Sequence, residues 1–116
     1  MTIQDTVATL LQFSILLSIY HWHTSSYSRH KATDELYHHL LEFMDQLVEY
    51  YQGKHPRIQF NHDIRIQTVT DDTILPILDS LSNTVELITV RDEGIRARRD
   101  DLIGYIHQTM YLFTLH

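Results

Sequence analysis

The sequence of 116 residues contains no cysteine and little glycine or proline. Without cysteine, disulfide bonds and thiolate metal sites are excluded, and nothing in the composition argues for secretion. Only 3 glycines and 2 prolines interrupt the chain, which favours long helices. No lysine- or arginine-rich tail is present, and the formal net charge of −6 argues against nucleic acid as a partner.

The overall composition is typical of one globular domain. A hydrophobic fraction of 43% is ordinary for such a protein, and a chain of 116 residues is long enough to bury a core. We therefore predict a single domain over residues 1–116. Nine histidines are many for this length, and some of them are expected at the surface, since histidine is often only partly buried.

The longest uninterrupted pattern runs from Ser26 to Tyr51 and predicts a helix of about seven turns. It contains neither glycine nor proline, and Gly53 follows its end. Its apolar residues recur every three or four positions in two neighbouring rows. The first row is Leu36, Leu40, Phe43, Leu47 and Tyr50, and the second is Tyr37, Leu41, Met44, Val48 and Tyr51.

Four residues of metal-ligand type, His30, Asp34, Asp45 and Glu49, lie beside the second row. At about 100° per residue they fall within roughly a third of a turn. His30 and Asp34 are one turn apart, as are Asp45 and Glu49, so each pair can bind one ion. The two pairs lie about 16 Å apart along the axis, which no single ion spans. They are half-sites that an antiparallel second copy about a two-fold axis would complete; the alternative is a solvated polar edge.

Residues 3–22 predict another helix, which is apolar on nearly all sides. A membrane span or signal anchor is one interpretation. However, Gln12, Ser14 and Ser18 interrupt the apolar stretches, and no basic segment precedes them. We expect a helix buried on two sides, by its own bundle and by a neighbouring copy, with no membrane partner.

The turn after this helix brings two further histidines close to the first half-site. The hydroxyls of residues 24–26 can cap the next helix, so the connection is a short hairpin. Either His21 or His23 then lies near His30 and is a candidate for the third ligand.

The second half of the chain predicts two more helices. Residues 52–70 have mostly even apolar spacing and predict either an extended crossover or a short hairpin. A third helix is expected to begin near Asp71 or Asp72, with Pro76 in its first turn, and a fourth to cover residues 92–114. The prediction is an all-α four-helix bundle with a long connection between its second and third helices.

The order His21-Trp22, His30, Asp34, Asp45 and Glu49 resembles the dinuclear iron site of the miniferritins, the Dps branch of the ferritin-like superfamily. That family has a longer turn between its two histidines, with a glycine that is missing here, so His23 remains a rival to His21. Two segments, HWHTSSYSRHKATDELYHHL and RRDDLIGYIHQTMYLFTL, more closely resemble a small family of uncharacterised ferritin-like proteins of phages and large DNA viruses.

The resemblance implies a ferritin-like up-down bundle that binds Fe(II), or Zn(II) or Mn(II) in its place, and oxidises iron. His21, His30 and Asp34 of one subunit and Asp45 and Glu49 of another would act as metal ligands and as the catalytic set. It further implies a homo-oligomer built from an antiparallel dimer of the first two helices and a hollow mineral store, in the cytoplasm, the host cytoplasm or a virion. The alternative is a virion-associated or interaction helical bundle with at most a structural metal.

Overall fold

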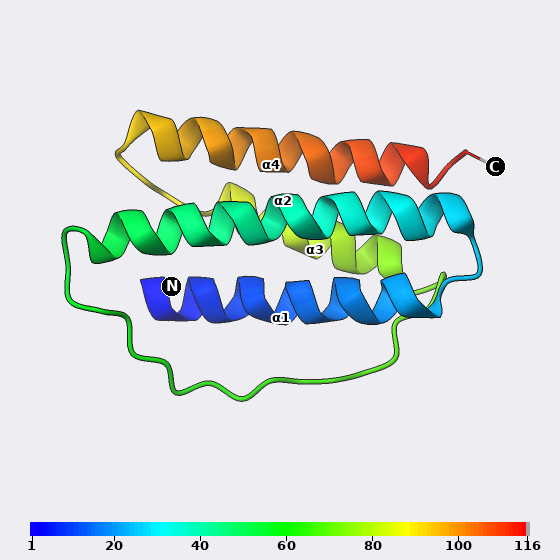
Figure 1. The fold of residues 1–116 in the computed structure, drawn as a ribbon, viewed down its shortest axis with the longest axis horizontal. Helices are drawn as coiled ribbons and strands as arrows, with labels where there is room; N and C mark the ends of the chain where they lie inside the picture. The colour runs from blue at the N-terminus through cyan, green and yellow to red at the C-terminus, as the bar shows by residue number, and fades with distance from the viewer. Residues whose placement is uncertain (116) are drawn as a thin grey trace.

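The computed structural model describes residues 1–115, which contain four α-helices and no strand. The helices are α1 (Ile3–His23), α2 (Tyr27–Gln52), α3 (Ile74–Glu86) and α4 (Glu93–Leu112). α1 contacts α2 and α3, and α4 contacts the same two helices. Figure 1 shows that each contacting pair runs antiparallel. The all-α prediction is confirmed.

Three of the four helices begin at a side-chain cap. Thr2 and Asp5 form a capping box, in which the Asp5 N–H donates to Thr2 Oγ1 over 3.1 Å. Ser26 accepts a hydrogen bond from the Arg29 N–H at the start of α2, and Asp92 accepts one from the Ile95 N–H at the start of α4. Because these caps satisfy otherwise free backbone donors, these helices begin within one residue of the predicted positions.

The core is built on the first apolar row of α2. Leu36, Leu40, Phe43 and Leu47 are buried, and Tyr50 is half-buried beside them. The other helices contribute Leu10, Leu17 and Tyr20 from α1, Leu78, Leu81 and Val85 from α3, and Leu102 and Ile106 from α4. Through this row α2 packs against α1 and α4, and its opposite face, with Asp34, Asp45 and Glu49, is exposed.

The connection between α2 and α3 is an extended crossover, and the alternative hairpin is wrong. It lies along α1 in Figure 1 and is attached there by polar contacts. The Gln12 side chain bonds both backbone groups of Arg65, accepting from its N–H over 2.7 Å and donating to its carbonyl over 2.5 Å. His62 Nε2 lies 2.9 Å from Asp5 Oδ1, and this contact lowers the pKa of the Asp5 carboxyl. α1 therefore holds a segment that has no secondary structure of its own.

α3 begins at Ile74, so the predicted start near Asp71 or Asp72 is wrong. Asp71 caps no helix. Its Oδ1 instead accepts a 2.6 Å hydrogen bond from the Tyr20 hydroxyl and lies 3.6 Å from Nη1 of Arg29. Arg29 also donates to the carbonyl of Phe113 over 3.1 Å. This network joins the ends of α1, the crossover and α4 to the beginning of α2.

α1 is long and apolar enough to cross a membrane by length and composition, and it is the one such helix found in residues 1–115. In the fold it packs against α2 and α3, and Leu10, Leu17 and Tyr20 are completely buried. Its outward side keeps apolar residues in contact with solvent. Trp22 is 76% exposed and Leu11 is 40% exposed. The inner face of α1 thus packs in the core, whereas its outer face is apolar and exposed.

Candidate metal half-sites on α2

His21 at the end of α1 and His30 in the first turns of α2 are stacked on one another. Their ring centroids lie 3.7 Å apart and the ring planes differ by 18°. Nδ1 of His21 lies 2.9 Å from the carbonyl oxygen of His30, and Nδ1 of His30 lies 2.9 Å from the carbonyl oxygen of His21. The short turn between the helices allows this reciprocal arrangement because it brings the end of α1 directly beside the start of α2.

The reciprocal contacts determine which ring nitrogen carries the proton. A carbonyl oxygen can only accept a hydrogen bond, so Nδ1 must donate in both rings. In the neutral imidazoles, Nε2 is therefore the atom with a free lone pair. Metal-binding histidines commonly donate their other ring nitrogen to a carbonyl in this way, which fixes tautomer and orientation. Within residues 1–115, no hydrogen bond occupies Nε2 of His21 or His30.

The structure brings His21 next to His30, whereas His23 is exposed and makes no hydrogen bond within the described residues. Of the two rivals, His21 therefore has the position expected of a third ligand. Trp22, between them, faces solvent.

Asp34 follows His30 by one turn and is exposed on the same side of α2. Its Oδ1 lies 3.8 Å from Nε2 of His38, one turn further on. Sequence reasoning missed His38 as a neighbour of this half-site. The signal was present, because His30, Asp34 and His38 follow one another at intervals of four residues.

Asp45 and Glu49 form the second pair, one turn apart and both exposed. Within residues 1–115 neither carboxylate takes part in a hydrogen bond or an ion pair of its side chain. In the part of the chain that the structure describes, no side-chain contact therefore competes for these two carboxylates.

The described residues of one chain contain no group of three metal-ligand side chains. In the part of the chain that the structure describes, no three histidine, aspartate or glutamate side chains are grouped closely enough to hold a metal ion.

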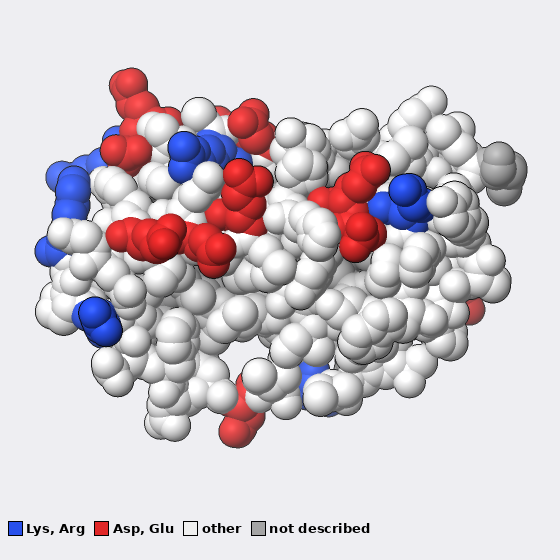
Figure 2. Space-filling model, viewed as in Figure 1, with Lys and Arg blue, Asp and Glu red and all other residues white. Residues whose placement is uncertain are grey.

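Both half-sites lie on a surface that is free in the monomer. His30, Tyr37, Leu41 and Val48 are partly exposed along the edge of α2 that carries Asp34 and Asp45. On α1, Leu11, Ile15, Ser18 and Trp22 recur every three or four residues and so share one outward stripe. Figure 2 shows acidic side chains in separate groups over α2 and a largely uncharged surface over α1. We call this surface, formed by the α1 stripe and the α2 edge, the outer α1/α2 face.

The fold defines a small all-α protein, and its outer α1/α2 face exposes imidazole and carboxylate side chains. Residues 21–113 match the family of unknown function DUF5856, and the chain belongs to that family. It is 30% identical over 95 residues to the uncharacterized 14.6 kDa protein in the mobD-ri intergenic region of Enterobacteria phage T4, covering 82% of this chain and 74% of the relative. No solved structure matches. These comparisons support the expected relation to phage proteins, and they name no metal.

Proposed function

We propose that the protein binds Fe(II) at two equivalent sites formed between two antiparallel copies and oxidises it there. The observation that carries the proposal is the His21–His30 pair. Two backbone carbonyls orient these rings, and within residues 1–115 no hydrogen bond occupies the Nε2 lone pair of either ring. Neutral imidazole and carboxylate oxygen together form a donor set that suits Fe(II), and also Zn(II) or Mn(II).

The donor set fits a shared site better than one within a single chain. His21, His30 and Asp34 lie towards one end of α2, and Asp45 and Glu49 lie about 16 Å further along it. A two-fold axis across the outer α1/α2 face would bring the first group of one copy to the second group of the other. The same contact would bury the α1 stripe with Trp22 and Leu11, which the monomer leaves exposed.

The chemistry expected at such a site is oxidation by dioxygen. Two Fe(II) substrate ions would each lose one electron, and one O₂ with two protons would become H₂O₂. Three carboxylates per site would balance much of the charge of the ions, and histidine ligands would leave coordination positions open for the oxidant. The antiparallel contacts between helices, with one long crossover, are compatible with the ferritin-like arrangement that the sequence resemblance implies.

The test is complementation between two inactive variants. Asp34→Ala removes a ligand from one half-site and Glu49→Ala from the other, so either homodimer would bind metal weakly. After subunit exchange, each heterodimer would regain one intact site. We expect Co(II) binding, and Fe(II) oxidation in air, to return to about half the native level per heterodimer, which is about a quarter of the native level for a fully exchanged 1:1 mixture. Mixed variants that recover no binding would contradict the shared site.

The second candidate function is a phage-associated interaction protein whose helices serve only as a scaffold. The exposed outer α1/α2 face favours it, because an apolar surface of this kind marks a protein contact whether or not metal is bound. Native protein that forms the dimer but shows no Fe(II) oxidation above the Asp34→Ala, Glu49→Ala double variant would support this alternative.

A further inference from the structure

A cavity of about 710 Å³ opens at the end of the bundle where α1 begins and α2 and α3 end. α3 ends at Glu86 and α4 begins only at Glu93, so the linker between them crosses this end of the molecule. No helix fills the space that the linker leaves. The volume lies in the range of small-molecule sites.

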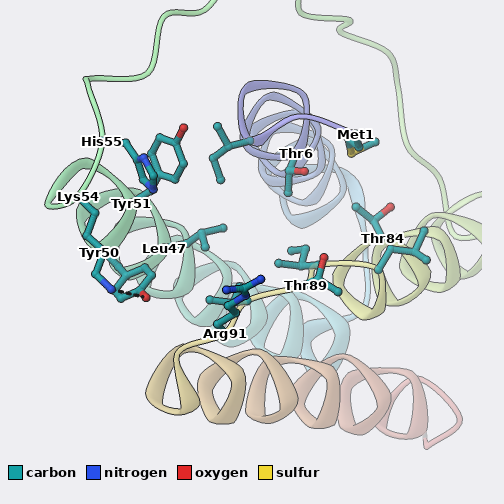
Figure 3. A pocket seen from close by; sticks show the side chains of 14 residues that line it. Met1, Thr6, Leu47, Tyr50, Tyr51, Lys54, His55, Thr84, Thr89 and Arg91 are labelled. Atoms are coloured by element: carbon teal, nitrogen blue, oxygen red, sulfur yellow. Dashed lines mark hydrogen bonds between the residues drawn. The ribbon is translucent and has the colours of Figure 1, made fainter.

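The wall of the cavity is apolar with hydroxyl groups along it. Leu47 of α2 and Ile88 of the linker are buried beneath it, and Tyr50 and Tyr51 are half-buried at its side. In Figure 3, Thr6 of α1 and Thr84 of α3 lie on other sides of the same space. Leu87 also lines the cavity and is 80% exposed, so apolar surface here contacts water. A ligand with an apolar body would remove that surface from solvent.

The charge at this cavity is opposite to the charge of the whole chain. The net charge is −6, yet no acidic side chain lines the cavity, whereas Lys54 and Arg91 both do. Within residues 1–115, neither cation has a carboxylate within 4.0 Å. Unpaired cations beside an apolar wall attract an anionic group.

Lys54 is held in place by the cavity wall. Its Nζ donates a hydrogen bond to the Tyr50 hydroxyl over 3.2 Å, which the dashed line in Figure 3 marks. The same Nζ lies 5.0 Å from the centre of the Tyr50 ring. Next to it, the His55 ring is stacked on Tyr51, with centroids 4.4 Å apart. Arg91 lines the same cavity from the linker, and its guanidinium has the geometry to bind a carboxylate through two hydrogen bonds. The two cations therefore reach the same opening from different elements.

We propose that this cavity binds a small amphipathic carboxylate, with its alkyl or aromatic body against Leu47 and Tyr51 and its carboxylate between Lys54 and Arg91. The site is separate from the metal half-sites. Leu47, Tyr50 and Tyr51 lie on the side of α2 away from Asp45 and Glu49, since about 100° separates successive residues. Binding therefore does not depend on metal and is measured with the metal-free protein.

Calorimetric titration with decanoate tests the proposal, with decanol and decylammonium as neutral and cationic probes of the same length. We expect one decanoate per chain and affinities for decanol and decylammonium at least about fivefold weaker. Lys54→Gln and Arg91→Gln should each weaken decanoate binding by about three- to fivefold. Lys31→Gln and Arg98→Gln, exposed residues that do not line the cavity, are the matched controls and should bind as the native chain does.

Amide chemical shifts locate the bound probe. Under the proposal, decanoate shifts the resonances of residues 50–55 and 87–91 and leaves those of residues 30–38 in place. Lys54 and Arg91 are exposed, so the variants are expected to keep the helical circular dichroism spectrum of the native chain. No binding of decanoate, equal binding of all three probes, or shifts confined to the outer α1/α2 face would overturn the proposal.

Discussion

The hydroxyl of Tyr20 donates a 2.6 Å hydrogen bond to Oδ1 of Asp71, joining residues 51 positions apart in the sequence. Tyr20 is completely buried, and Asp71 lies at the end of the crossover. Removing the hydroxyl by Tyr20→Phe keeps the ring and deletes the bond. We expect the free energy of unfolding to fall by about 1 kcal/mol in urea titrations. Tyr27→Phe, at an exposed position, is the control and should change it by much less.

The same bond makes stability depend on pH in acid. The hydrogen bond from Tyr20, together with one from Thr24 and the charge of Arg29, lowers the pKa of the Asp71 carboxyl below 3.8. The stabilisation is complete above this unfolded-state value and is lost as the pH falls through the lower folded-state pKa. Native protein should therefore lose more stability than Asp71→Asn between about pH 4 and pH 2. An equal loss in both proteins, measured by urea unfolding, would contradict this role of Asp71.

At alkaline pH, we expect the stability of the fold to decrease as the pH rises. Burial raises the pKa of the Tyr20 hydroxyl above 10.0, and the bond to Asp71 raises it further. The neutral phenol thus stabilises the fold fully below the unfolded-state pKa, and this contribution is lost as the pH rises through the folded-state value. Tyr20→Phe should remove part of the stability loss above about pH 10. An unchanged alkaline profile in this variant would be the contrary result.

Gln12 is expected to control the order of the crossover without controlling the fold. Its amide makes both hydrogen bonds to the backbone of Arg65, and no secondary structure holds that segment otherwise. Gln12→Ala should speed tryptic cleavage after Arg57 and Arg65 severalfold while helix content stays constant. Gln4→Ala, with no side-chain hydrogen bond in residues 1–115, serves as the control. Cleavage at the native rate in Gln12→Ala would show that other contacts hold the crossover.

Substitutions of the histidines near the turn distinguish metal ligands from histidines that do not bind metal. His30→Ala removes one Nε2 and the ring that is stacked on His21, so Co(II) affinity should fall by more than about tenfold. His21→Ala should act similarly, whereas His23→Ala should bind as the native protein does because His23 lies away from His30. Isothermal titration of the four proteins at neutral pH checks this. Stronger loss in His23→Ala than in His21→Ala would reverse the assignment.

Much of the helical framework can be predicted from the sequence because its signals are local. The caps at Thr2, Ser26 and Asp92 and the glycine after α2 lie within a few residues of the ends they determine. The start of α3 is different, since Asp71 is drawn to Tyr20 in another helix and contributes nothing to the α3 N-terminus. Spacing predicts an N-terminal role for that aspartate and carries no information about a partner 51 residues away.

The candidate half-sites likewise have one part that the sequence predicts and one part that it does not. The positions of Asp34, Asp45 and Glu49 on one side of α2 follow from helical periodicity alone. Whether His21 or His23 meets His30 depends on the conformation of the three-residue turn, and spacing leaves both choices open. The cavity beside Lys54 and Arg91 could not be predicted, because its lining comes from segments far apart in the chain.

An anomalous-difference map from crystals grown anaerobically with Fe(II), recorded at the iron absorption edge, tests the central claim most directly. The account predicts two equivalent peaks per dimer, related by a two-fold axis across the outer α1/α2 face. Each peak would lie beside Nε2 atoms of the His21–His30 pair and Asp34 of one copy and beside Asp45 and Glu49 of the other. A map with no peak at these residues, or with Asp34 and Asp45 facing solvent in the assembled protein, would contradict the proposed function.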